Sequence, residues 1–182
     1  MTEFTYKTPQ SSSLPGCNVF DTDTQKNFGL GNRVTVHYGA NSDLCADFVY
    51  IRAGAALTAG QLCELPKISG TDAYVVDVPL TTTLAATAAP DQFDKIACCI
   101  PQVDIPSGSY GWAAVKGDIE VLAAASASEG AKLYTTGTAG VLDDADTDYL
   151  VEDFVLVADN GGSQAKVLGH AFKDLNLYRE AA

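Results

Sequence analysis

The sequence predicts an all-β protein, a small β barrel or sandwich with an extended N-terminal arm. Between Ile96 and Phe172 it consists of short apolar runs separated by turns that contain Gly, Asp or Ser. These runs are rich in Val, Ile and aromatic residues, which favour strands. Hydrophobic residues make up 47% of the 182-residue chain, but many of them are Ala. We therefore expect one thin core built from strands rather than from packed helices.

Residues 1–32 lack this succession of apolar runs and turns, and we predict that they form the arm. Pro9 and Pro15 exclude a helix between residues 8 and 16 and would interrupt a ladder of strand hydrogen bonds. An arm of this kind buries little surface alone, but its apolar anchors allow it to dock on a neighbouring subunit. The aromatic anchors are Phe4, Tyr6, Phe20 and Phe28. A disordered tail is the alternative. Residues 33–182 then form the β-rich domain.

The first half of that domain predicts several strands. Residues 33–38 alternate apolar and polar side chains, which is typical of a half-buried strand and places His37 on the polar side. Further strands are expected at residues 48–52, 61–65 and 74–78. The segment from Leu80 to Pro90 is either a short helix or a surface loop, and its threonines favour the loop.

The second half shows its strands more clearly. They are expected at residues 95–100, 110–115, 119–124, 132–135, 151–157 and 165–172. Lys116, Gly117 and Asp118 are interpreted as a hairpin turn between two of them. Residues 154–157 show no alternation, so we expect a central strand that is covered on both faces. Residues 174–180 are expected to add a last helical turn.

The charge balance argues against several classes of partner. The chain has 11 basic and 23 acidic residues, a formal net charge of −12. This field repels both phosphate backbones and anionic lipids, so we expect no direct binding to nucleic acid or to membranes. No run approaches the roughly 20 apolar residues that cross a bilayer, and the N-terminus lacks a signal-peptide pattern. We expect a soluble protein that folds where it is made.

The five cysteines form an odd set without a CxxC pair. This pattern favours neither a zinc knuckle nor a disulfide framework, so we predict buried free thiols in a reducing compartment. Cys98 and Cys99 are adjacent, and neighbouring side chains on a strand point to opposite faces. A disulfide between them is therefore not expected.

The sequence offers few residues suited to catalysis or metal binding. His37 and His170 are far apart, and they form a metal site only if the fold brings them together. Residues 143–148 resemble the opening of a calcium loop, but Tyr149 and Val155 stand where that loop needs Gly and Glu. We interpret this segment as a solvated acidic turn, with cation binding as the alternative.

Catalytic motifs are missing from the sequence as well. It has no G-x-S-x-G nucleophile elbow and no glycine-rich segment that leads into a helix. We therefore predict a protein that is not an enzyme and that needs neither a cofactor nor a metal. Trp112 is interpreted as a core or interface anchor rather than a platform for a sugar.

Several phrases in the sequence resemble a group of small phage virion proteins, the capsid decoration or cement proteins of the DUF2190-like kind. The phrases lie at residues 57–65, 111–121, 129–134, 139–142 and 166–171. They share a rhythm of strand, turn and strand with the patterns G-x-x-L-Y and G-x-L. The likeness covers about two thirds of the chain. The N-terminal arm and the insertion at residues 74–90 depart from it.

The resemblance implies a structural virion protein that binds the outer surface of an icosahedral phage capsid and stabilises it. Its partner would be the major capsid protein, and it would act from the capsid exterior after synthesis in the host cytoplasm. A homo-trimer suits this role, because three contacts on one rigid body bind with avidity. The expected capsid or intersubunit anchors are Phe4, Tyr6, Phe20, Phe28 and Trp112.

Three alternatives to the decoration protein stay open. A tail-tube or head-fibre component would show the same sequence pattern of many short strands. A carbohydrate-binding module would use Trp112 and Tyr110. A metal-dependent hydrolase would need His37 as a ligand.

Overall fold

A computed structural model confirms the all-β prediction. It describes residues 11, 12, 14, 16–39, 43–66, 73–77, 79–81, 95–125, 127–145, 149–160 and 162–179. These residues form twelve strands and no helix. The strands are β1 Ser11–Ser12, β2 Arg33–Tyr38, β3 Leu44–Ala53, β4 Cys63–Glu64, β5 Val75–Val76, β6 Lys95–Pro101, β7 Tyr110–Ala123, β8 Lys132–Thr135, β9 Leu142–Asp143, β10 Tyr149–Leu156, β11 Ala165–Ala171 and β12 Asn176–Arg179.

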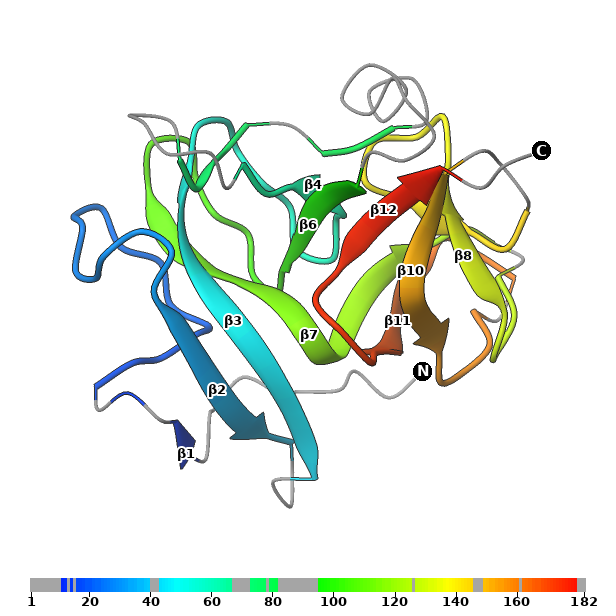
Figure 1. Ribbon diagram of the computed structural model, residues 1–182, viewed down its shortest axis with the longest axis horizontal. Coiled ribbons are helices and arrows are strands. Elements are labelled where there is room, and N and C mark those ends of the chain that lie inside the picture. The colour runs from blue at the N-terminus through cyan, green and yellow to red at the C-terminus, as the bar shows by residue number, and fades with distance from the viewer. Residues whose placement is uncertain are drawn as a thin grey trace.

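Five strands close a ring (Figure 1). β6 pairs with β7, β7 with β11, β11 with β10, β10 with β12, and β12 with β6, and every pairing is antiparallel. Closure leaves no free edge in the ring itself, as in other barrels. A ring with an odd number of straight strands cannot alternate direction throughout, so at least one strand has to bend.

β7 bends along its length (Figure 1). The bend is assigned to Gly117, which has a φ of 92° and lies where the partner of β7 changes. β7 pairs with β3 up to this residue and with β11 from this residue onward. The predicted hairpin turn at Lys116, Gly117 and Asp118 is therefore wrong, because one strand continues through it. The positive φ of Gly117 bends the strand instead of reversing the chain. Two residues earlier, the register against β3 shifts at Val115, which lies between the partners of Asp47 and Phe48 and forms a bulge.

The second bend lies in β10, where Asp153 has a φ of 55°. β10 pairs with β12 before this residue and with β11 after it. Phe154 and Leu156 are buried, whereas Val155 is half-buried and Val157, just beyond the strand, is 43% exposed. The expectation of a strand covered on both faces is therefore wrong. The alternation was hidden in the sequence because apolar side chains occupy both faces.

β3, β6 and the first half of β7 form a wall between two hydrophobic cores. On β3, Phe48 and Tyr50 belong to the larger core, whereas Val49 and Ile51 belong to the smaller one. Trp112 and Ala113 divide in the same way on β7. This arrangement explains why the wall strands read as continuous apolar runs, since both of their faces are buried.

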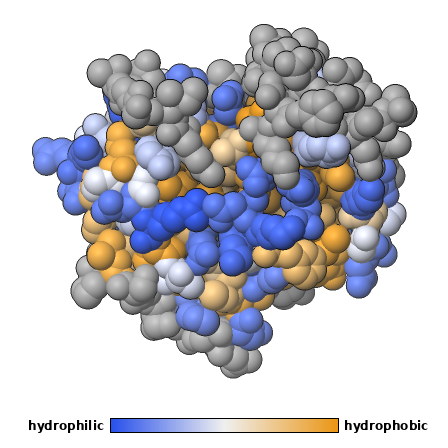
Figure 2. Space-filling model, viewed as in Figure 1, coloured by the Kyte–Doolittle hydropathy of each residue, from blue (hydrophilic) through white to orange (hydrophobic). Residues whose placement is uncertain are grey.

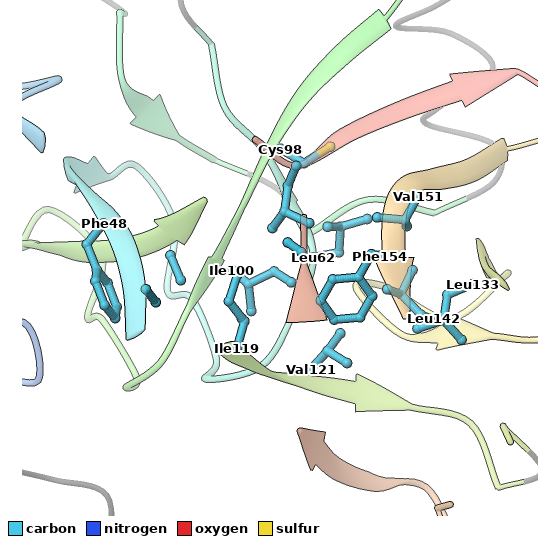
Figure 3. Packing of buried hydrophobic residues seen from close by; sticks show 14 of the residues in the cluster. Phe48, Leu62, Cys98, Ile100, Ile119, Val121, Leu133, Leu142, Val151 and Phe154 are labelled. Carbon is cyan, nitrogen blue, oxygen red and sulfur yellow. The ribbon is translucent and has the colours of Figure 1, made fainter. Parts of the chain in front are cut away.

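The barrel interior is part of the larger core (Figure 3). Phe154 from β10 projects towards Ile100 from β6 and Val121 from β7 (Figure 3). Leu62 reaches the same space from the segment before β4. Burial of such side chains contributes roughly 1.5–3 kcal/mol each, so this interior supplies much of the stability of the fold.

The described residues between 16 and 32 pack on the body. Cys17 and Val19 are buried in the larger core. Asp23 and Tyr110 exchange two backbone hydrogen bonds of 2.8 Å. The N–H of Tyr50 donates to the carbonyl of Asn32 at 2.8 Å. These backbone hydrogen bonds attach the segment to β3 and β7 of the wall. Residues 1–10 of the predicted arm lie outside the described residues.

The predicted last helical turn is wrong, because residues 176–179 form β12. Leu177 is buried between half-buried Asn176 and Tyr178, which is the two-residue period of a strand. The pairings of β12 with β6 and β10 complete the ring, and this tertiary contact overrides a weak local preference. The question of loop or helix at residues 82–90 lies outside the described residues.

Candidate functional site

The most concentrated group of polar side chains lies where β3 and β11 meet along β7. Ala46 of β3 and Ala171 of β11 are both register partners of Gly117. The pairings of β3 and β11 with β7 thus end at the same residue of β7. We call this junction the seam and define it by Tyr38, Cys45, Asp118 and His170.

Asp118 connects the strands of the seam. Its Oδ1 lies 2.7 Å from Nδ1 of His170 on β11. Its Oδ2 accepts a 2.9 Å hydrogen bond from the backbone N–H of Cys45 on β3. Its backbone carbonyl accepts a hydrogen bond from the hydroxyl of Tyr38 on β2. One residue of β7 therefore joins β2, β3 and β11.

The ends of the seam residues are partly exposed. The side chains of His170 and Asp118 are 36% and 20% exposed, respectively. The His170 ring packs edge-on against Phe172, with ring centroids 4.8 Å apart, and Phe172 is 60% exposed. Because the carboxylate uses both oxygens in this network, the arrangement is suited to holding strands together.

Cys45 of the seam also contacts His37, which lies just outside the seam. They are register partners on β3 and β2, and the Cys45 Sγ lies 3.8 Å from the His37 Nε2. Burial raises the pKa of the Cys45 thiol, and the nearby charges of Asp47 and Asp118 raise it further. The thiol is therefore held protonated, unlike the activated thiolate that nucleophilic catalysis needs.

The cysteines are free thiols, and four of the five are buried. Cys98 belongs to the larger core and Cys99 to the smaller one, so their side chains point to opposite sides of the wall, as predicted. Burial, and to a lesser degree Asp23, raises the pKa of Cys17 to about 11. Burial also raises the pKa of Cys63 to about 12.

These positions predict that Cys45 alone reacts with a thiol reagent in the folded protein. At pH 8 the reaction should be slow, because the raised pKa leaves little thiolate, and its rate should increase as the pH rises past 9. A colorimetric disulfide reagent measures this as one slow thiol before unfolding and five after it. Cys45→Ser should remove the slow phase. Two or more reactive thiols in the folded protein, or an unchanged phase in this variant, would contradict the prediction.

Three of the five predicted anchors lie among the described residues. Phe20 packs edge-on against Tyr38 and Phe48, with ring centroids 5.7 and 6.3 Å apart. Phe28 packs against Trp112, with centroids 5.3 Å apart. These rings are partly buried and rest on the larger core of their own chain. Their roles towards a capsid or another subunit stay predictions.

Trp112 is only 1% exposed. It therefore occupies the core, which is one of its two interpretations, and its ring leaves almost no surface for another molecule. Tyr110 is half-buried and stacks on Tyr50, with ring planes 11° apart. A sugar platform built from Trp112 and Tyr110 is not supported by these positions. Phe4 and Tyr6 lie outside the described residues.

The acidic turn is described only as far as Ala145. Asp143 accepts a hydrogen bond from the N–H of Asp144, and Asp144 accepts one from the N–H of Ser128. The carboxylates thus serve the local backbone as turn acceptors. Residues 146–148, and with them the question of a bound cation, lie outside the described residues.

The fold brings the two histidines to the same region, through Cys45 and Asp118. Across the described ranges, no group of three or more His, Cys, Asp and Glu side chains is placed to hold a metal ion. In the same part of the chain, no helix has both the length and the hydrophobicity to cross a bilayer. No family model matches the chain, and no curated protein matches it.

The sequence pattern predicts neither the pair of His37 with Cys45 nor the pair of Asp118 with His170. It predicts a strand only from residue 48, whereas β3 begins at Leu44. With that start, the hairpin register places His37 opposite Cys45. The pairing of Asp118 with His170 carries no local signal, because it depends on the long-range register of β7 and β11.

Proposed function

We propose that the chain is a structural virion protein that binds the outer surface of an icosahedral phage capsid and stabilises it. It acts as a homo-trimer on the major capsid protein, and it makes or breaks no covalent bond. The proposal rests first on the resemblance of its sequence phrases to phage decoration proteins. Two features of the fold and the charge of the chain support it.

The main supporting observation is that the sequence segments that resemble decoration proteins pack together in one β body. The N–H of Leu62, in the first phrase, donates to the carbonyl of Gly140 at 3.0 Å. Val121, in the second phrase, is the register partner of Val167 in the last. Segments far apart in the sequence thus lie side by side in one β body.

The N-terminal segment already acts as an added strand. β1 pairs antiparallel with β2, where Ser11 and Ser12 face His37 and Val36. An extended segment that adds to a sheet edge gains affinity from main-chain hydrogen bonds. The same kind of contact, made with a neighbouring molecule, would tether a decoration protein to a shell.

The charge of the chain suits a protein that is abundant around packaged DNA. The formal net charge is −12. Hydrophilic side chains form a band across the face seen in Figure 2. Like charge keeps unbound copies apart and disfavours contact with nucleic acid.

The test mixes the purified protein with capsid shells that lack it. We expect the protein to sediment with the shells and to raise the temperature at which they disrupt. Protein that stays in the supernatant, with shell stability unchanged, would refute the proposal. Assembly of the protein alone into tubes would favour the tail-tube alternative, and retention on a sugar column without shells would favour a carbohydrate-binding module.

A truncation tests the arm. Removal of residues 1–10 should weaken shell binding while the far-ultraviolet circular dichroism of the β body is retained. The cut must stop before residue 16, because Cys17 and Val19 are part of the larger core and their loss would unfold the body. Full binding by the truncated protein would place the contact elsewhere on the body.

A further inference from the structure

His37 and Cys45 form a cross-strand pair of the type that brings side chains closest together. The N–H of Cys45 donates to Asp118 on β7, so the backbone of Cys45 points away from β2. The N–H groups of successive strand residues point to alternate sides. Tyr50 lies five residues after Cys45, so its N–H points to the opposite side, towards β2, and donates to the carbonyl of Asn32. His37 and Cys45 are therefore a non-hydrogen-bonded pair, in which the two side chains lie nearest to each other on one face.

The separation of the two side chains suits a metal ion bound between them. The Cys45 Sγ and the His37 Nε2 are 3.8 Å apart. With zinc bonds of about 2.3 Å to sulfur and about 2.05 Å to nitrogen, this separation corresponds to an S–Zn–N angle of about 120°. This angle lies near the tetrahedral range, so the present separation of the two atoms matches that of two ligands on one ion.

The surrounding charges favour a cation at this point. Asp47 and Asp118 raise the pKa of the Cys45 thiol, and Lys116 opposes them. The same carboxylates that disfavour a bare thiolate stabilise a dication that replaces the thiol proton. Asp47 is held beside the pair by a 2.6 Å hydrogen bond from the hydroxyl of Thr35.

We propose that His37 and Cys45 together bind a soft divalent cation of the zinc type, with water in the remaining coordination positions. The metal bonds to the Cys45 Sγ and to the His37 Nε2, and it loses two bound waters. The S–H bond of Cys45 breaks and its proton passes to the solvent. Because the described residues supply two protein ligands, the ion keeps open positions, unlike a closed structural zinc site. This site is independent of the proposed capsid role.

The test is a titration of the purified full chain with Cd²⁺ and, separately, with Zn²⁺. Cadmium bound to a thiolate gives a charge-transfer band in the ultraviolet, which reports on the sulfur directly. We expect one equivalent of metal per chain, with release of about one proton per ion at neutral pH.

Matched variants identify the ligands. Cys45→Ser should abolish the band, and the other four cysteines cannot replace it because they are buried. His37→Ala should weaken binding by at least the roughly 10–100-fold that loss of an outer-shell partner costs. His170→Ala is the control, because this histidine contacts Asp118 rather than Cys45 and its loss should leave the band in place.

Three outcomes would overturn the proposal. The first is no band in the natural protein, and the second is a band that survives Cys45→Ser. The third is equal affinity in the natural protein and His37→Ala. Circular dichroism of each variant confirms that the body is folded. Failure here would leave the shell-binding test unaffected, and the reverse also holds.

Discussion

Substitution of Gly117 by alanine should destabilise the protein by about 3 kcal/mol or more. Gly117 has a φ of 92°, a conformation that residues with a side chain rarely adopt. An added Cβ would also lie against the carbonyl of Cys45 and 2.8 Å from the Cα of Ala46. Both contacts are with backbone, so β3 itself would have to move away from β7.

Gly108 provides a matched control for this substitution. Its φ is 79°, close to that of Gly117, but nothing lies within 4 Å of the position of an added Cβ. Gly108→Ala should therefore cost only the backbone strain, about 1–2 kcal/mol. Urea unfolding followed by circular dichroism measures both losses. Equal losses in the two variants would show that β3 yields easily and would contradict the prediction.

Truncation of Trp112 to alanine should cost about 3–5 kcal/mol, the range for a large aromatic residue lost from a core. The side chain is 1% exposed, and its ring lies 5.0 Å from Tyr50 and 5.3 Å from Phe28, centroid to centroid. The cavity would open between the wall and the segment before β2. Amide hydrogen exchange should therefore accelerate most near Phe28.

Phe172→Ala is the control for this second prediction. Phe172 is 60% exposed, and its main aromatic contact is the ring of His170. Its removal should cost less than about 1 kcal/mol. Thermal and urea unfolding are followed by circular dichroism rather than by tryptophan fluorescence, because Trp112→Ala lacks the only tryptophan of the chain. A loss below about 1 kcal/mol for Trp112→Ala would mean that the wall closes over the gap.

The sequence predicted the strands of the second half well where turn chemistry separates them. β8 runs over the predicted residues 132–135, and β11 matches its predicted segment to within one residue. The error at Gly117 has a physical cause. A glycine followed by Asp is compatible with both a hairpin turn and a bend within one strand, and only the partners on both sides of β7 decide between them.

The polar pairs could be predicted only in part. The alternation of residues 33–38 correctly placed His37 on the exposed face of β2. It could not supply the partner, because apolar Leu44 and Ala46 gave the start of β3 no clear period. The seam depends on where β3 and β11 end along β7, and such long-range register is set by the packing of the two cores rather than by local residues.

The ring also determines when the chain can fold during synthesis. β6 needs β12 as a partner, and about 75 residues separate the two strands in the sequence. A ribosome adds roughly 5–20 residues per second, so β6 waits several seconds with one side unpaired. Pairings between such distant segments also form slowly, because loop closure costs entropy before any contact repays it. The nascent polypeptide therefore acquires its barrel late, in a step that needs residue 179 outside the exit tunnel, and chaperones that shield apolar strands should increase its yield.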